Sequence, residues 1–212
     1  MNEQPAMAKR STITVAKVAV AVALCAIGGC VSAARPPRAV RHNEPPMPYI
    51  DVGACPFEGC VYRAWTANDT VVLRTDRRES APIAYTVKKG EQVIALTGVV
   101  EISRPGRVQF LKTVNLESAS GQLHIERGQT LFLLTYQGEG STTAWFQGRL
   151  YEAVDGAMAI FNDLCDRRHG DCDSTIIERP KSVWWVRVRN GRGQSGWTSE
   201  PAKFDGKDLY GD

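Results

Sequence analysis

The sequence predicts a mainly β protein built from small sheets that close on themselves, together with one short helix. Short runs of alternating apolar and polar residues recur at spacings of roughly ten residues, as in small barrels. Basic-glycine pairs, which suit turns, separate several of these runs. Only residues 156–165 place apolar side chains at helical spacing.

The chain begins with a segment that is typical of an export signal. Three basic residues between positions 9 and 17 precede an uncharged run at 18–29. That run is too short to cross a bilayer of roughly 30 Å as a helix. It suits the apolar part of a secretory signal, for which either Met1 or Met7 is the start.

Two processing sites follow the apolar run. The stretch IGGC at 27–30 resembles the lipobox of bacterial lipoproteins, which predicts a signal peptide over 1–30 and a lipid on Cys30. Val31 rather than Asp comes next, and by resemblance to Gram-negative lipoproteins this favours an outer-membrane protein facing the periplasm. The alternative is cleavage after Ala34, which would release a soluble periplasmic protein.

Proline dominates the stretch that follows. Residues 35–48 read RPPRAVRHNEPPMP, and proline both fixes φ and lacks a backbone donor, which excludes a helix or a central strand. We expect residues 31–48 to form an extended tether, about 3.1 Å per residue where it is polyproline-like. Such a tether would hold the folded part away from a membrane anchor.

Strand patterns then continue to residue 153. Single strands are predicted at 61–67, 70–75 and 107–116, and strand pairs at 83–102, 122–140 and 143–153 with turns at Lys89-Gly90, Arg127-Gly128 and Gln147-Gly148. Residues 83–100 and 123–140 share one layout, a basic-glycine pair followed by an apolar strand, which suggests two copies of one small β-unit.

Four cysteines lie beyond the signal, and an even number in an exported chain predicts two disulfides. We favour the local pairs Cys55–Cys60 and Cys165–Cys172, because short loops close at low entropic cost. A zinc site including His169 is disfavoured, since gaps of four and six residues do not match the usual ligand spacing at both ends.

Charge and motif content argue against several functions. The net charge is +3, and removing residues 1–34, which hold three basic and one acidic side chain, leaves about +1. No basic surface for nucleic acid or lipid head groups is predicted, so membrane contact would come only through a lipid anchor. The stretch GQSG at 193–196 is one residue short of a nucleophile elbow, and we predict no catalytic residues, metal or cofactor.

The stretch SVWWVRVRNGRGQSGWTSEP at 182–201 predicts a hairpin with a tight Asn190-Gly191 turn. Alternation along the first strand separates two faces. Trp184, Val186 and Val188 share the face expected in the core, and Trp185, Arg187 and Arg189 share the other. We predict that the second face, together with Trp65, binds a ligand. The alternative is that a second, inserted β-unit covers Trp185, with Arg187 and Arg189 stacked alongside or salt-bridged.

Two stretches carry a family resemblance. TVVLRTDRRESAPIAYTVKKGEQVIAL, at 70–96, and WVRVRNGRGQSGWT, at 185–198, resemble the opening half and the closing hairpin of the bacterial SH3-like (SH3b) domain. The matching residues are Leu73, Gly90, Trp185, Val188, Arg189, Gly196 and Trp197. In the family these halves are nearly contiguous, whereas here about 80 residues separate them.

The resemblance implies two SH3-like units, the second inserted before the last hairpin of the first. The first unit would comprise 49–104 plus 180–212, the second 105–155, and a helix with a disulfide loop would occupy 156–179. Two tandem barrels are the alternative. The chain also resembles exported bacterial proteins with stretches like CPFEGCVYR and PKSVWWV, a likeness that supplies no activity.

By the same resemblance, the protein would be a non-catalytic binding module of the cell envelope. Its ligand would be a peptidoglycan peptide or an envelope protein, held by stacking on aromatic rings and by arginine contacts to carboxylates. Two alternatives are a structural envelope protein in which every tryptophan is buried, and, less favoured, a cell-wall hydrolase that uses aspartate and glutamate side chains.

Overall fold

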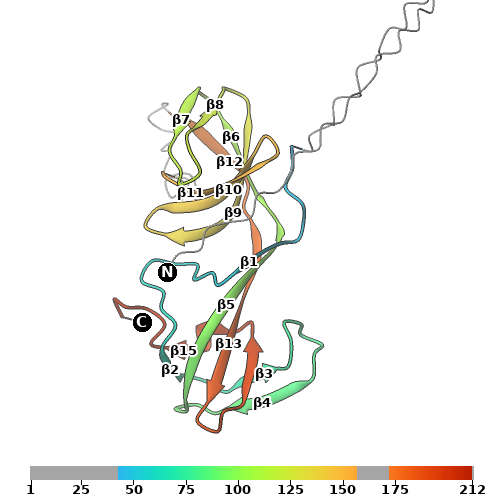
Figure 1. Cartoon of the computed structure of the whole chain (residues 1–212), viewed down its shortest axis with the longest axis vertical. Helices are drawn as coiled ribbons and strands as arrows, with labels where there is room; N and C mark the ends of the chain where they lie inside the picture. The colour runs from blue at the N-terminus through green and yellow to red at the C-terminus, as the bar shows by residue number, and fades with distance from the viewer. Residues whose placement is uncertain (1–42, 157–171, 212) are drawn as a thin grey trace, which may run out of the picture. The chain divides into compact units, whose positions relative to one another are not determined.

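Two long antiparallel strands, β5 (Gln92–Arg104) and β13 (Lys181–Asn190), pair along almost their whole length in the computed structural model of the protein (Figure 1). The structure describes residues 43–156 and 172–211, which belong to one compact unit built almost entirely of strands. The predicted mainly β fold is therefore confirmed. The SH3-like class and the division into two units stay predictions.

Both long strands belong to an eight-stranded sheet. Its order is β15-β2-β5-β13-β14-β3-β4, and β1 also pairs with β5. The sheet curls around a core that includes Trp65, Leu73, Val186, Val188 and Phe204. The other strands are β1 (Tyr49–Val52), β2 (Ala64–Ala67), β3 (Val71–Arg74), β4 (Ile83–Val87), β14 (Ser195–Thr198) and β15 (Phe204–Asp205), and a 3-10 turn, η1 (Pro201–Lys203), precedes β15.

A second sheet of five strands has the order β11-β10-β9-β6-β12. Its strands are β6 (Gly106–Phe110), β9 (Thr130–Gly138), β10 (Ser141–Phe146), β11 (Arg149–Val154) and β12 (Ser174–Glu178). A separate pair, β7 (Val114–Leu116) with β8 (Leu123–Ile125), covers the same core, whose largest members include Phe110, Leu131 and Phe146. The predicted strand 107–116 is thus interrupted between Phe110 and Val114.

The chain passes from one sheet to the other at two adjacent points. Arg104 ends β5 and pairs in register with Lys181, and its Nη1 lies 2.9 Å from Glu178 Oε1. Gly106 begins β6 where a Cβ would lie only 2.9 Å from Pro180 Cδ, so only glycine lets the two segments come this close. A third core, formed by Val100, Ile102 and Leu134, joins residues of the two sheets.

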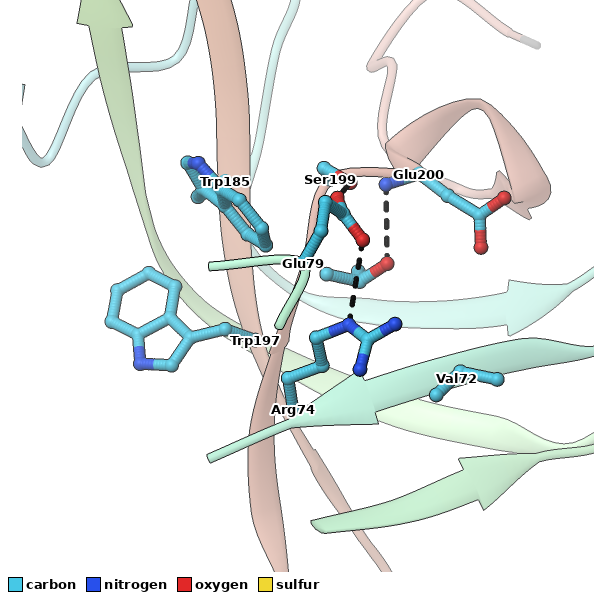
Figure 2. A pocket seen from close by; sticks show the side chains of 8 residues that line it. Val72, Arg74, Glu79, Trp185, Trp197, Ser199 and Glu200 are labelled. Carbon is cyan, nitrogen blue, oxygen red and sulfur yellow. Dashed lines mark hydrogen bonds and ion pairs between the residues drawn. The ribbon is translucent and has the colours of Figure 1, made fainter. Parts of the chain in front are cut away.

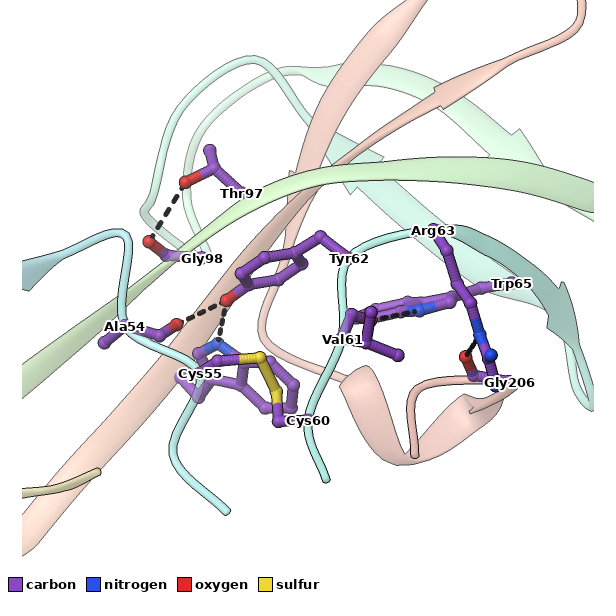
Figure 3. Close-up of a disulfide and its surroundings, with 11 residues drawn as sticks. Ala54, Cys55, Cys60, Val61, Tyr62, Arg63, Trp65, Thr97, Gly98 and Gly206 are labelled. Carbon is purple, nitrogen blue, oxygen red and sulfur yellow. Dashed lines mark hydrogen bonds between the residues drawn. A yellow bond between two sulfur atoms is a disulfide. The ribbon is translucent and has the colours of Figure 1, made fainter. Parts of the chain in front are cut away.

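The CPFEGC loop is tied to β5 through an aromatic network (Figure 3). The predicted Cys55–Cys60 disulfide is confirmed. Just beyond it, the Tyr62 hydroxyl donates to the Ala54 carbonyl and accepts a hydrogen bond from Trp184 Nε1 at 3.3 Å. These groups pack directly against Gly98 of β5, where there is no room for a side chain.

Several predicted segments lie outside the described residues. They comprise the signal peptide 1–30 with Cys30, the cleavage site after Ala34, and all of the helix 156–165 except its first residue, Gly156. Cys172 is disulfide-bonded, but Cys165 is not described, so the Cys165–Cys172 pairing stays a prediction. Pro45 and Met47, at the end of the predicted tether 31–48, contribute to the fold, because Pro45 is buried and Met47 packs against the third core.

The turn between β13 and β14 differs from the one predicted. Gly193, not the Asn190-Gly191 pair, has the positive φ, at +81°. The Asn190 amide hydrogen-bonds to the Gln194 carbonyl, so three residues form the loop. Asn190 was predicted to be a central residue of the turn, but it precedes the loop and stabilises it. Its side-chain Oδ1 accepts hydrogen bonds from the backbone amides of Arg192 and Gln194, both at 3.0 Å.

The tight packing around Gly98 generates a stability prediction. In Gly98→Ala, the new methyl group would overlap with the Tyr62 hydroxyl and Trp184 Nε1 and lie 2.7 Å from the Ala54 carbonyl oxygen. We expect the free energy of unfolding, measured by urea denaturation, to fall by more than about 2 kcal/mol. Gly191→Ala is the control, since no atom lies within 4 Å of its Cβ, and it should change stability by less than about 0.5 kcal/mol.

Tyr85 makes stability sensitive to alkaline pH. Burial, reinforced by the negative charge of Glu91, raises the pKa of its phenol to about 12, although the Asn190 backbone opposes the shift. The fold therefore favours the neutral phenol, whose contribution is complete below pH 10 and is lost as the pH rises towards 12. The urea midpoint should fall more steeply between pH 10 and 12 in the wild type than in Tyr85→Phe. Parallel slopes for the two proteins would contradict this assignment.

Candidate aromatic-arginine face

The candidate site is the outer face of β13, β14 and β3, which we call the aromatic-arginine face and define by Arg74, Arg77, Trp185, Arg187, Arg189 and Trp197. Register explains how its central residues meet. Arg187 of β13 lies opposite Trp197 of β14, and Trp197 lies opposite Arg74 of β3. Residues directly opposite on paired strands share one face, so these three side chains form one cross-strand row.

Alternation along β13 assigns the two faces as predicted for most of the strand. Val186 and Val188 are fully buried in the core inside the curl, while Arg187 and Arg189 are exposed on the outer side. Trp184, predicted to be in the core, is half-buried and packs against two of the cores.

Trp185 shares the outer face but is only 5% exposed. It lines a small pocket together with Arg74, Glu79, Trp197 and residues of the segment after β14 (Figure 2). The pocket volume is about 30 Å³, comparable to the space that one water molecule occupies in the liquid. Trp185 is therefore buried, and this ring is not an open platform for a peptide. The residues that share its pocket come from β3, β14 and the segments that follow them, and none from the predicted inserted unit at 105–155.

Polar contacts hold the rim of this pocket in place (Figure 2). Arg74 Nε lies 3.4 Å from Glu79 Oε2, and Arg74 Nη1 donates to the Ala81 carbonyl at 2.9 Å. Ser199 donates to the other carboxylate oxygen of Glu79. Arg74 is therefore a neutralised, structural part of the face rather than a free cation.

The remaining arginines differ from Arg74 in their partners. The Arg77 guanidinium lies 5.6 Å from the centre of the Trp197 ring, a cation-π arrangement. Arg187 Nη2 donates to Ser195 Oγ at 3.0 Å. Neither Arg187 nor Arg189 forms an ion pair with any residue in the described part of the chain. The face thus presents two exposed positive charges, without an acidic partner in the part of the chain that the structure describes, beside the half-buried Trp197.

Trp65 does not belong to this face. Its side chain is fully buried, its Nε1 donates to the Val61 carbonyl at 3.0 Å, and its ring packs against Tyr62 and Phe204. The structure therefore separates Trp65 from the other three predicted ligand-binding residues and makes it a core residue.

Sequence reasoning missed Arg74 and Arg77 as members of the face and Glu79 as the partner of Arg74. Arg74 lies in the predicted strand 70–75, and the other two lie in the polar stretch after it. Their local pattern does not indicate that they meet the distant strand at 195–198. The family motif did mark Trp197, although as a structural position. Within residues 43–156 and 172–211, no group of three or more His, Cys, Asp or Glu side chains is arranged to hold a metal ion.

Comparisons with known protein families, with curated proteins and with solved structures give no significant match. No helix formed by the described residues has the length and apolar character needed to span a bilayer.

The different burial of the two tryptophans leads to a prediction. Trp185→Ala should lower the free energy of unfolding by about 3 to 5 kcal/mol, the usual range for removing a buried aromatic ring. Trp197→Ala, in which a half-buried ring is lost, should cost at least about 1 kcal/mol less. Urea denaturation of both variants measures the difference, and equal losses would show that the burial of Trp185 adds nothing to stability.

Proposed function

We propose that this protein is a non-catalytic binding module of the cell envelope, and that the aromatic-arginine face binds carboxylate groups of a peptidoglycan peptide. The observation that carries the proposal is the pair of exposed arginines, Arg187 and Arg189, which have no acidic partner among the described residues. An envelope protein with an acidic surface is the other ligand of the same chemistry.

The physical basis is the geometry of arginine on a strand. Two residues apart, Arg187 and Arg189 project from the same face with roughly 6–7 Å between their backbone positions. Each guanidinium can grip one carboxylate through two parallel hydrogen bonds. Peptidoglycan stem peptides carry several free carboxylates along a short chain, which suits such a pair. Trp197 between Arg187 and Arg74 offers an apolar surface for the ligand backbone.

The export signal, the lipid on Cys30 and the outer-membrane location are parts of the same proposal. An anchor at Cys30 followed by a proline-rich stretch would leave the aromatic-arginine face free to reach the cell wall. A tethered binding module of this kind needs no catalytic residues at the site. A cell-wall hydrolase remains the less favoured proposal.

One observation favours the structural alternative. All five tryptophans are buried or half-buried, as expected if the protein serves as a scaffold without a ligand groove. The two proposals differ over the arginines, because a scaffold needs no uncompensated charge on its surface, whereas a carboxylate-binding face depends on it.

We expect full-length protein to co-sediment with purified peptidoglycan sacculi, and the double variant Arg187→Gln/Arg189→Gln to lose at least tenfold in apparent affinity. The matched control is Arg107→Gln/Arg127→Gln, which removes the same charge from exposed positions associated with the other sheet. Binding should also weaken as salt is raised, because exposed charges are screened.

Equal binding by the wild type, the double variant and the control would refute the role of the aromatic-arginine face. If none of the proteins binds sacculi, cross-linking in cells decides between an acidic protein partner and the structural alternative. Circular dichroism should show all variants folded, since every substituted side chain is exposed.

A further inference from the structure

A larger cleft lies on another part of the molecule. Residues 51–55, which run from β1 to the disulfide, line one side, and residues 135–137 of β9 line the other. Its volume of about 290 Å³ is roughly ten times that of the pocket beside Trp185 and near the lower end of the range for small-molecule sites. It can hold a small molecule or the end of one long side chain.

Asp51 carries the only formal charge among the described residues that line this cleft. Burial raises the pKa of its carboxyl, and the nearby negative charge of Glu152 raises it further. The pKa of the Tyr49 phenol is also raised, mainly by burial and in addition by the negative charges of Asp51 and Glu152. Asp51 forms no ion pair with another described residue, so its carboxylate lacks a compensating cation.

Thr135 is the polar neighbour of Asp51. It is 2% exposed, and its side-chain hydrogen bond to Asp51 lowers the carboxyl pKa against the larger effect of burial. The hydroxyl is neutral, so it orients the Asp51 carboxylate without compensating its charge. That charge is therefore left for a cation that enters the cleft.

We propose that this cleft binds an alkylammonium group, carried either by a small amine or by a lysine side chain. An ammonium has three donors and no acceptor, and among the residues that line the cleft the Asp51 carboxylate and the Gln137 amide oxygen are acceptors. Gln137 Oε1 already accepts from the Ala153 amide at 3.1 Å and retains a second lone pair.

This inference stands apart from the proposed function, because it concerns different residues and a ligand group of opposite charge. It is tested with ¹⁵N-labelled full-length protein, titrated with cadaverine or with Nα-acetyl-lysine methylamide while amide chemical shifts are recorded. We expect shifts concentrated at residues 51–55 and 135–137. 1-Pentanol, which has the chain length without the charge, should cause at least tenfold weaker effects.

Asp51→Asn should weaken binding of both amines at least tenfold, while the control Glu126→Gln, an exposed carboxyl at a turn, should bind as the wild type does. Asp51→Asn should also be at least as stable as the wild type, since the lost charge is uncompensated. Binding of the lysine derivative but not of cadaverine would assign the cleft to a protein side chain, and the reverse to a free amine. Undiminished binding by Asp51→Asn, or an equal response to pentanol, would overturn the proposal.

Discussion

The pairing of β5 with β13 is the constraint on which the rest of the structure depends. These strands supply Val93, Val186 and Val188 to the core of the eight-stranded sheet, and Val100 and Ile102 to the core that joins the two sheets. About 80 residues separate them in the chain, and that intervening chain contains the five-stranded sheet and the β7-β8 pair. Forming the pair therefore requires closing a long loop, a cost that only extensive pairing and burial can offset. Both candidate sites are attached to this pair of strands, so they exist only once it has formed.

The tryptophans support the fold more than they serve binding. Trp65 fills the main core, and Trp184 packs edge-on against both Trp65 and Phe57 of the disulfide loop. Trp185 lies under the salt-bridged rim made by Arg74 and Glu79. Burying such rings contributes several kcal/mol each, which suits a small domain that has to hold a long two-stranded ribbon in place. The groups left at the surface are arginines, so recognition on this face would depend on charge more than on stacking.

The sequence was sufficient to predict most of the strands and the local disulfide, because both follow from short-range patterns, whereas the strands β1, β12 and β15 were not predicted. Alternation placed Val186 and Val188 inside and Arg187 and Arg189 outside. It could not predict the burial of Trp185, since part of the surroundings of this ring comes from the 72–79 segment, which is more than 100 residues away in the chain. The prediction of a tight Asn190-Gly191 turn was wrong, because the Asn190 side chain caps a three-residue loop that dipeptide preferences do not reveal. The cleft beside Asp51 escaped prediction for the same reason as Arg74: it is assembled from segments that meet only in the folded chain.

The two candidate sites are linked through the register of β5. Val99 lies opposite Trp185 on one side, whereas Val100 lies opposite Asp51 on the other. Successive residues of a strand face opposite surfaces, so Trp185 and Asp51 belong to opposite faces of one sheet. A small ligand cannot contact both sites, so they bind independently of each other. Both nevertheless depend on the register of β5. A slip of one residue would exchange the faces and abolish both sites together. Gly98 precedes these two valines and packs against Tyr62 and Trp184, where there is no room for a side chain. A slip by one residue would bring a side chain into this position, so the packing beside the disulfide loop opposes the slip. The same packing thereby supports both proposed binding surfaces.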